Sequence, residues 1–242
     1  QRSKKILEIA AFTLDGALLA QEAGADRIEL CENPNDGGTT PSYGTLKQAR
    51  KFLSIPVYPI IRPRGGNFVY TAKEFESMLY DCKLCNDLGF EGVVTGMLHA
   101  SGNIHVQQLK QFKQAAGSMQ ITFHRAFDRC ANTSQALDEI IDCGCTRILT
   151  SGQFPSAVDG LHCLRELASQ VKHRICIMPG SGVKSSNIEL FLRDNLFDEF
   201  HTAARKSSEI GRIFTPNSMH ENLTHTIVDS EEIKRIKNAM DT

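Results

Sequence analysis

The stretch ILEIAAFTLDGALLAQEAGADRIELC, residues Ile6–Cys31, contains one complete strand–helix–strand unit. Apolar runs of strand length lie at Ile6–Ala10 and Arg27–Cys31, and the amphipathic stretch Thr13–Ala23 between them has helical length. Gly24 follows this helix, at the place where a left-handed residue commonly ends one. A helix that connects two consecutive strands predicts that the strands are parallel.

The same alternation recurs at intervals of about 30 residues along the chain. Further strands are expected at Val57–Ile61, Gly92–Thr95, Gln120–His124, Arg147–Thr150, Arg174–Met178 and Glu199–Thr202. Further helices are expected at Tyr43–Phe52, Thr71–Leu88, Ile104–Ala116, Thr133–Asp142, Ser156–Gln170, Ser185–Leu196 and Ser230–Met240. Eight strands alternating with eight helices predict a single (β/α)8 TIM barrel over residues 1–242. A doubly wound open sheet is the alternative, but no G-x-G-x-x-G turn follows the first strand.

Local signals mark several helix starts. Thr71–Glu74 and Ser186–Glu189 match capping boxes, and Thr40–Pro41 matches an N-cap followed by proline at the first helical position. The segment 206–229 differs, because it is polar and poorly periodic. It predicts an irregular loop or lid, an extra C-terminal segment added to the barrel.

Composition limits the classes of partner. Hydrophobic residues make up 41% of the 242 residues, charged residues 23%, and the net charge is −1. This balance predicts no binding to nucleic acid and none to an acidic membrane. No N-terminal segment combines a basic start, an apolar stretch and a small-residue cleavage site, and no apolar run approaches the roughly 20 residues of a spanning helix. We therefore expect a cytoplasmic protein whose eight cysteines are reduced.

Charged side chains occupy strand positions that should point into the barrel. In the second strand, Ile28 and Leu30 suit the face that meets helices, so Arg27 and Glu29 point inward. The same alternation predicts these inward side chains: Glu8, Arg27, Glu29, Arg62, His124, Glu199 and His201. An unpaired buried charge costs several kcal/mol, so we expect Arg62 to pair with Glu8 or Glu29.

Two interpretations of these charges stay open. They form either a structural ion-pair network or a functional site. The two are balanced for Arg27 and Glu199. Glu29, Arg62 and His124 lie near the C-terminal ends of their strands, which is the end where barrel enzymes carry their sites.

A site at that end has candidate residues for two tasks. For proton transfer the candidates are Glu8, Glu29 and His124. For anion binding they are Arg62, Arg64, Arg125, Gly180, Gly182 and Arg205. Gly180 and Gly182 belong to MPGSGV after the seventh strand, where barrels commonly bind phosphate through backbone N–H groups. A simple glycine turn explains this motif equally well.

One cysteine has a distinct position. Cys31 ends the second strand and faces inward beside Glu29, and a thiolate there is a ligand that Cu(I) prefers. Cys82 and Cys85 lie mid-helix, with no second pair at zinc spacing, which predicts core packing.

Several segments resemble the CutC copper-homeostasis family. They are GADRIELC (Gly24–Cys31), GGTTPS (Gly37–Ser42), PIIRPRGGNF (Pro59–Phe68), TFHRAFD (Thr122–Asp128) and RILTSG (Arg147–Gly152), in the order of the family. The resemblance implies a cytoplasmic (β/α)8 barrel connected with copper tolerance, with Cys31 as the matching Cu(I) ligand. Ala10 and Ala11 stand where a second cysteine is common in the family.

Three functional hypotheses follow. The first is a copper-homeostasis protein that binds Cu(I) through Cys31. The second is a TIM-barrel enzyme acting on a small anionic substrate, phosphorylated or carboxylated. The third is a barrel whose charges are only structural. The expected partners are a copper ion or a small anionic ligand, and assembly into a homo-oligomer stays open.

Overall fold

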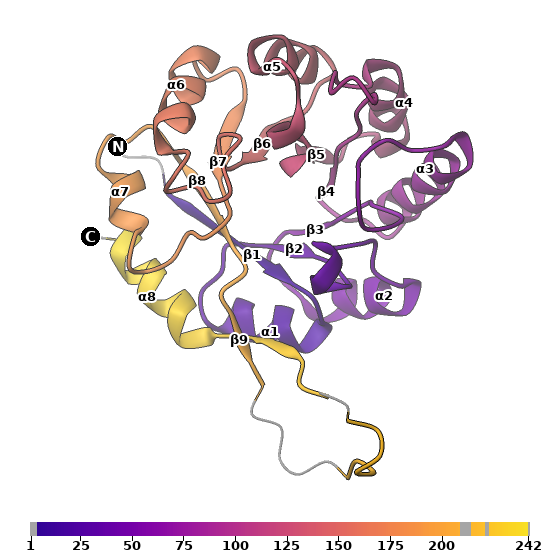
Figure 1. Cartoon of the computed structure of the whole chain (residues 1–242), viewed down its shortest axis with the longest axis vertical. Helices are drawn as coiled ribbons and strands as arrows, with labels where there is room; N and C mark the ends of the chain where they lie inside the picture. The colour runs from indigo at the N-terminus through magenta and orange to yellow at the C-terminus, as the bar shows by residue number, and fades with distance from the viewer. Residues whose placement is uncertain (1–3, 209–213, 221–222, 242) are drawn as a thin grey trace.

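The computed structural model describes residues 4–208, 214–220 and 223–241. Its eight parallel strands are β1 (Ile6–Ala11), β2 (Arg27–Leu30), β3 (Val57–Pro59), β4 (Gly92–Thr95), β5 (Gln120–Phe123), β6 (Arg147–Thr150), β7 (Cys176–Pro179) and β8 (Glu199–Thr202). Hydrogen bonds connect them in the orders β3-β2-β1-β8 and β4-β5-β6-β7. Ile61 N donates to Val94 O at 2.7 Å between the ends of β3 and β4, and β7 lies beside β8. The predicted (β/α)8 barrel is confirmed (Figure 1).

Helices surround the strands. They are α1 (Leu14–Glu22), α2 (Tyr43–Phe52), α3 (Ala72–Asp87), α4 (Val106–Ala116), α5 (Thr133–Asp142), α6 (Leu161–Val171), α7 (Ile188–Leu192) and α8 (Ser230–Met240). Short 3-10 helices follow β2 at Pro34–Asp36 and β5 at Arg125–Arg129. Within the described residues, none of these helices combines the length and the apolar character needed to cross a membrane.

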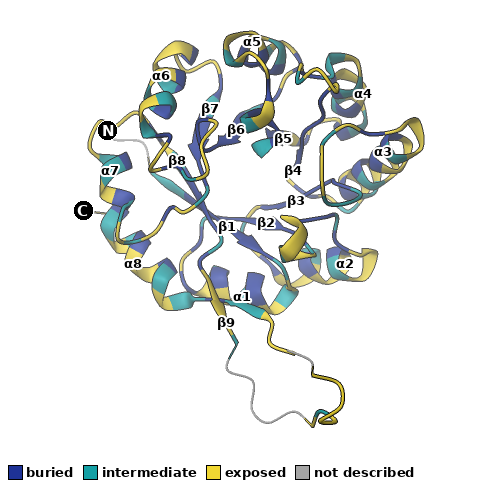
Figure 2. Cartoon of the chain, viewed as in Figure 1, coloured by how far each residue is buried: buried dark blue, intermediate teal, exposed yellow. Residues whose placement is uncertain are grey.

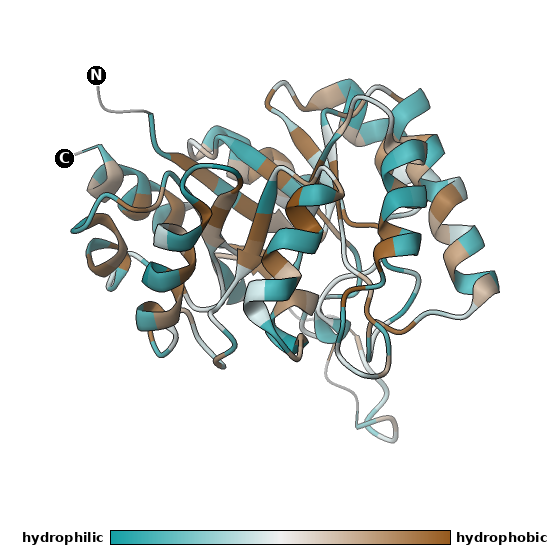
Figure 3. Ribbon diagram, turned by 90° about the horizontal axis from the view of Figure 1, so that it is seen from above, coloured by the Kyte–Doolittle hydropathy of each residue, from teal (hydrophilic) through white to brown (hydrophobic). Residues whose placement is uncertain are grey.

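Burial follows the strand alternation. Ile28 and Leu30 belong to the large core between strands and helices, as predicted. A second, small apolar cluster lies inside the barrel and contains Cys31, Tyr58 and Val94. The strands are almost entirely buried, whereas the helices expose their outer faces (Figure 2), and those faces are largely hydrophilic (Figure 3). Burial of apolar surface on both sides of the strands therefore holds the two layers together.

The predicted helix starts are right in one case of three. Thr71 and Glu74 form a reciprocal capping box at the start of α3. α2 is capped by Ser42 rather than Thr40, because Thr40 Oγ1 instead accepts a hydrogen bond from Arg62 N. The predicted box at Ser186–Glu189 is also wrong. The preceding Ser185 donates to Glu232 through N and Oγ, and α7 begins only at Ile188, with Asn187 as its N-cap residue.

The C-terminal segment forms a two-stranded ribbon. β9 (Arg205–Ser207) pairs antiparallel with β10 (Thr226–Val228), and the described residues 214–220 lie away from the barrel (Figure 1). The predicted irregular loop or lid, 206–229, thus includes strand residues at both of its ends. Residues 209–213 and 221–222 of it lie outside the described part.

Gly92→Ala is expected to destabilise the protein by about 1–3 kcal/mol, because an added methyl group would overpack the barrel interior. A Cβ at Gly92 would approach the Tyr58 ring to under 3.0 Å. Chemical denaturation measures the effect. Gly44→Ala in α2 is the control, since its Cβ would meet only Ser42 Oγ, at 3.9 Å. Equal stability of the two variants would contradict this view of the packing.

Candidate active site

Buried ion pairs form the floor of the barrel interior. Arg27 on β2 donates hydrogen bonds to the carboxylates of Glu8 on β1 and Glu199 on β8. Arg147 on β6 donates to Glu199 Oε2 at 2.9 Å. Strand register creates the first pair, because Glu8 lies directly opposite Arg27 in the β1–β2 ladder. The pairing offsets the cost of removing these charges from water.

An aromatic ring completes the floor. The guanidinium carbons of Arg27 and Arg147 both lie 5.1 Å from the centre of the Tyr58 ring. The Tyr58 hydroxyl donates to Gln120 Oε1 at 2.7 Å, and Arg147 Nη2 donates to the same oxygen at 2.9 Å. The charges of Arg27 and Glu199 are thus paired with other charged side chains of the protein. This pairing favours a structural role for Arg27 and Glu199.

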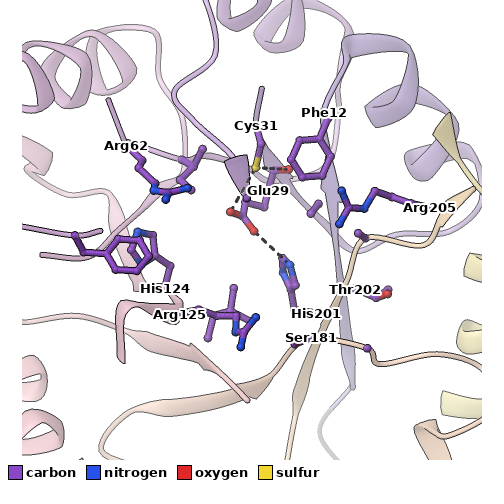
Figure 4. A pocket seen from close by; sticks show the side chains of 17 residues that line it. Phe12, Glu29, Cys31, Arg62, His124, Arg125, Ser181, His201, Thr202 and Arg205 are labelled. Carbon is purple, nitrogen blue, oxygen red and sulfur yellow. Dashed lines mark hydrogen bonds and ion pairs between the residues drawn. The ribbon is translucent and has the colours of Figure 1, made fainter. Parts of the chain in front are cut away.

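Above the floor, a histidine lies between two glutamates. His201 on β8 is opposite Glu8 in the β1–β8 ladder, and its Nδ1 is 2.8 Å from Glu8 Oε1. Its Nε2 is 3.4 Å from Glu29 Oε2 on the other side (Figure 4). All three residues are buried, and Glu8 is fully enclosed. The order Glu8–His201–Glu29 leads from the floor to the barrel mouth.

The charges of these three groups depend on one another. Burial opposes ionisation of Glu8, but Arg27 and His201 outweigh it and lower the pKa of Glu8. Burial raises the pKa of Glu29, and the charge of His201 opposes this only in part. Burial opposes protonation of His201, yet the hydrogen bond that its Nδ1 donates to Glu8 and the charge of Glu29 raise its pKa above 6.5. The protonation states of His201 and Glu29 are therefore coupled.

Cys31 adjoins this pair. Its thiol donates to Glu29 Oε1 at 3.4 Å (Figure 4). Burial, followed by the charge of Glu29, raises the pKa of Cys31 well above its ordinary value of 9.0. Cys31 is therefore a protonated thiol at neutral pH, and a metal ion would have to displace its proton.

A cavity of about 280 Å³ opens above Glu29 and His201 at the C-terminal end of the barrel. Most of the predicted site residues meet there (Figure 4). The cavity is lined by Glu29, Cys31, Arg62, His124, Arg125, Gly182 and Arg205 from the predicted set, and by Phe12, Phe68, Leu149, Ser181, His201 and Thr202 among others. The residues come from both four-stranded ladders, so only the closed barrel brings them together.

Three predicted residues are not part of the cavity wall. Glu8 lies beneath it, behind His201. Arg64 instead pairs with Glu74 at the start of α3, through Nε–Oε1 at 2.5 Å. Gly180 N donates to Thr150 O at 3.0 Å in the β6–β7 ladder, so the predicted use of this N–H for an anion is wrong.

Arg62 differs from the prediction in its partners. Its guanidinium donates to the backbone oxygens of Asp36, Gly38 and Gly66, at 2.5, 2.9 and 2.9 Å. The predicted ion pair with Glu8 or Glu29 is wrong, because Arg62 follows the end of β3, where strand alternation no longer directs the side chain. Arg62 Nε is buried without a hydrogen-bond acceptor in the described structure.

His124 is a neutral donor. Burial, and next the charge of Arg62, lower its pKa to about 3. Its Nδ1 accepts a hydrogen bond from Ala126 N at 3.1 Å, so the ring proton is on Nε2. This Nε2 is buried and has no acceptor among the described residues. The environment favours hydrogen-bond donation by His124 over proton abstraction.

Donors for an anion remain at the rim. In the described structure, the N–H groups of Ser181 and Gly182 have no acceptor, and both residues have left-handed backbones with φ of 80° and 77°. The exposed Arg205 lies over Phe12, with its guanidinium carbon 5.1 Å from the ring centre. Arg125 pairs with Asp128 at 2.7 Å and donates to Ser151 Oγ at 2.8 Å. Asp128 therefore neutralises part of the charge that Arg125 could offer to an anion.

Glu8, Glu29 and His201 are also the group of described residues that could hold a metal ion, with one ligand atom of each within 4.8 Å of the others. Both ring nitrogens of His201 already face carboxylates, however. A metal ion would have to displace a proton from His201.

Sequence reasoning gave two residues too little weight. His201 was expected to point inward, yet the proton-transfer candidates did not include it. Arg147 was missed, although its alternation with Ile148 in β6 is the signal that identified Arg27 beside Ile28. Both residues have their charged partners on strands far away in the sequence: Glu8 and Glu29 for His201, and Glu199 for Arg147.

The fold and the site define a class: (β/α)8-barrel proteins with a cavity lined by charged and polar residues at the C-terminal mouth. The sequence model of the CutC family matches residues 5–206. The chain belongs to the CutC family.

Proteins of this family are similar to the chain over most of its length. The family protein CutC of Enterobacter sp. (strain 638) is 49% identical over 201 residues, which are 83% of this chain and 81% of the relative. CutC of Serratia proteamaculans (strain 568) is 42% identical over 241 residues, 97% of this chain and 95% of the relative. The solved structure of CutC from Streptococcus agalactiae is 32% identical with a TM-score of 0.78, covering 82% of this chain and 98% of that one.

Proposed function

We propose that this chain is an enzyme that transfers a proton to or from a small anionic compound, carboxylated or phosphorylated, at the barrel mouth. One observation carries the proposal: His201 lies between the fully buried Glu8 and the cavity-lining Glu29, 2.8 Å from the first and 3.4 Å from the second. A histidine oriented from behind by a carboxylate is an arrangement typical of general acid–base catalysis.

The roles follow from the positions. Glu8 holds His201 through Nδ1 and favours its protonated form. His201 Nε2 and Glu29 face the cavity, where either group can deliver or accept a proton. Arg27 keeps Glu8 ionised, so it supports the pair through Glu8.

The anionic class of the substrate is supported by the donors around the cavity. Arg205, Arg125, Ser181 and Gly182 all belong to the cavity wall, and the N–H groups of Ser181 and Gly182 have no acceptor in the described structure. Arg205 has no carboxylate partner within the described residues. A negative group on the ligand would complement this rim.

The test is a panel of small carboxylates, hydroxy and oxo acids and phosphate esters, incubated with the protein in deuterated water. Proton NMR records loss of C–H signals by solvent exchange or turnover. We expect at least one compound to react with the wild type and not with Glu29→Gln. Equal background rates for both proteins across the panel would count against the proposal.

A second candidate is Cu(I) binding through Cys31. The Streptococcus agalactiae relative is described as a candidate copper homeostasis protein, and Cys31 Sγ lies in the cavity wall. The fit is partial, because Cys31 is the one sulfur ligand among the described lining residues and its thiol is protonated. The third interpretation, a purely structural network, accounts for the floor but not for the donors at the mouth.

If the second candidate holds, Cys31→Ser is expected to remove stoichiometric Cu(I) binding under reducing conditions, because a hydroxyl is a poor ligand for a soft ion. Competition with a colorimetric Cu(I) chelator measures it. The buried Cys85→Ser is the control and should keep the site. Equal Cu(I) binding by wild type and Cys31→Ser would exclude Cys31 as the ligand.

The free state of all eight cysteines supports a reducing compartment, and we propose the cytoplasm. Assembly into a homo-oligomer stays a prediction.

A further inference from the structure

A second cavity lies next to the first. Its volume is about 620 Å³, and Gly37, Arg62, Phe68 and Arg125 belong to the walls of both cavities. It differs from the first in having Arg129, His99 and Asp36 in its wall, and it lacks Glu29, Cys31 and His201. A ligand held over Glu29 could therefore extend past Phe68 into this second space.

Positive charge concentrates around Phe68. The guanidinium carbon of Arg62 lies 5.0 Å from the centre of its ring, and that of Arg129 lies 5.8 Å away. Arg62 is bound by backbone oxygens, and Arg129 Nη1 donates to Arg125 O at 2.8 Å. In the described structure neither forms an ion pair with a carboxylate.

The two acidic groups nearby do not cancel this charge. Asp128 is occupied by Arg125, by Thr150 Oγ1 at 2.5 Å and by Ser151. Asp36 lines the second cavity and is the carboxylate that opposes an anion there. The wall contains three arginines, Arg62, Arg125 and Arg129, and only two carboxylates of the described residues lie near them. The net charge of this region is therefore positive.

A buried donor adds to the case for a ligand. Arg62 is 5% exposed, and its Nε–H has no acceptor within hydrogen-bond distance in the described structure; the nearby buried hydroxyl of Tyr70 also has no partner there. A buried donor without a partner is costly, and such groups in native proteins call for an explanation. The half-buried Phe68 packs against Arg62, and both residues belong to the walls of both cavities.

We infer that the second cavity binds a distal anionic group of the substrate, a carboxylate or phosphate, between Arg129 and Arg62 beside Phe68. The inference rests on the proposed function for its reacting end, which lies over Glu29 and His201. The substrate is then a compound with two acidic ends.

Inorganic phosphate is the first probe, and isothermal titration measures its binding. Arg129→Met is expected to weaken phosphate binding at least about tenfold, which is about 1.4 kcal/mol. Glu29→Gln, outside the second cavity, and Lys73→Met, at an exposed position of α3, should each change it less than about twofold. Glu29→Gln should abolish proton transfer and still bind phosphate in the second cavity. Absence of proton transfer by the wild type would therefore count against the proposed function only, whereas unchanged phosphate binding by Arg129→Met would count against this inference only. Arg129 is exposed, so its variant should fold, which circular dichroism checks.

The second probe is a series of dicarboxylates, succinate to adipate, against their monoamides. The wild type should bind at least one dicarboxylate about tenfold more tightly than the corresponding monoamide. Arg129→Met should bind the two with equal affinity. Arg129→Lys should restore part of it, because the charge returns without the planar guanidinium. Unchanged phosphate affinity in Arg129→Met would overturn the inference.

Discussion

His201→Asn is expected to lower the rate of proton transfer by about 10²–10⁴-fold, the contribution typical of a positioned acid–base group. Asparagine can keep a hydrogen bond to Glu8 Oε1 but cannot accept a proton. The rate is measured by C–H exchange on whichever panel compound reacts. His225→Asn is the matched control, since His225 is exposed in the C-terminal segment.

The size of the loss separates a catalytic from a merely structural role. If His201 only filled space, His201→Asn would change stability and leave the rate per folded molecule within about twofold of wild type. The pH profile adds a second readout. The wild-type rate should depend on a group titrating above 6.5, and that dependence should vanish in the variant.

Glu8→Ala is expected to destabilise the fold by about 3–5 kcal/mol, since it leaves Arg27 and His201 buried without their shared carboxylate. For a chain of this size that is a fall in Tm of about 6–20 °C. Calorimetry measures it. Lys73→Ala, which removes an exposed pair with Glu76, is the control and should stay within about 0.5 kcal/mol. A loss below about 1 kcal/mol for Glu8→Ala would contradict the buried network.

The same network predicts a pH dependence of stability. Glu8 has a lowered pKa in the folded state, so its contribution is present above 4.5 and is lost as pH falls toward that lowered value. His201 has a raised pKa, so its contribution is complete below 6.5 and is lost as pH rises through the folded value. Wild-type stability should therefore be greatest between these limits, and Glu8→Ala should flatten both slopes.

Strand alternation made much of the barrel and its inward charges predictable. Because side chains alternate in each strand, Ile28 fixes the direction of its neighbours Arg27 and Glu29 within four residues of sequence. Helix length and glycine signals are equally local, and Gly24 has the left-handed φ of 101° that its position predicted.

Pairing could not be predicted in the same way. Glu8 meets His201 because β1 and β8 are neighbours in a definite register, and the two residues lie 193 positions apart. Arg62 lies beyond β3, where loop backbone at Asp36 and Gly66 captures it. Alternation gives the direction of a side chain, but partners depend on barrel closure and loop conformation.

The central claim is that Glu8 and Glu29 hold His201 as a protonated group at the mouth of the barrel. NMR titration of the ¹⁵N-labelled imidazole of His201 tests it most directly. The account predicts a pKa above 6.5 that falls in Glu8→Gln. A His201 that titrates at or below 6.5 in the wild type, and does not respond to Glu8→Gln, would contradict it.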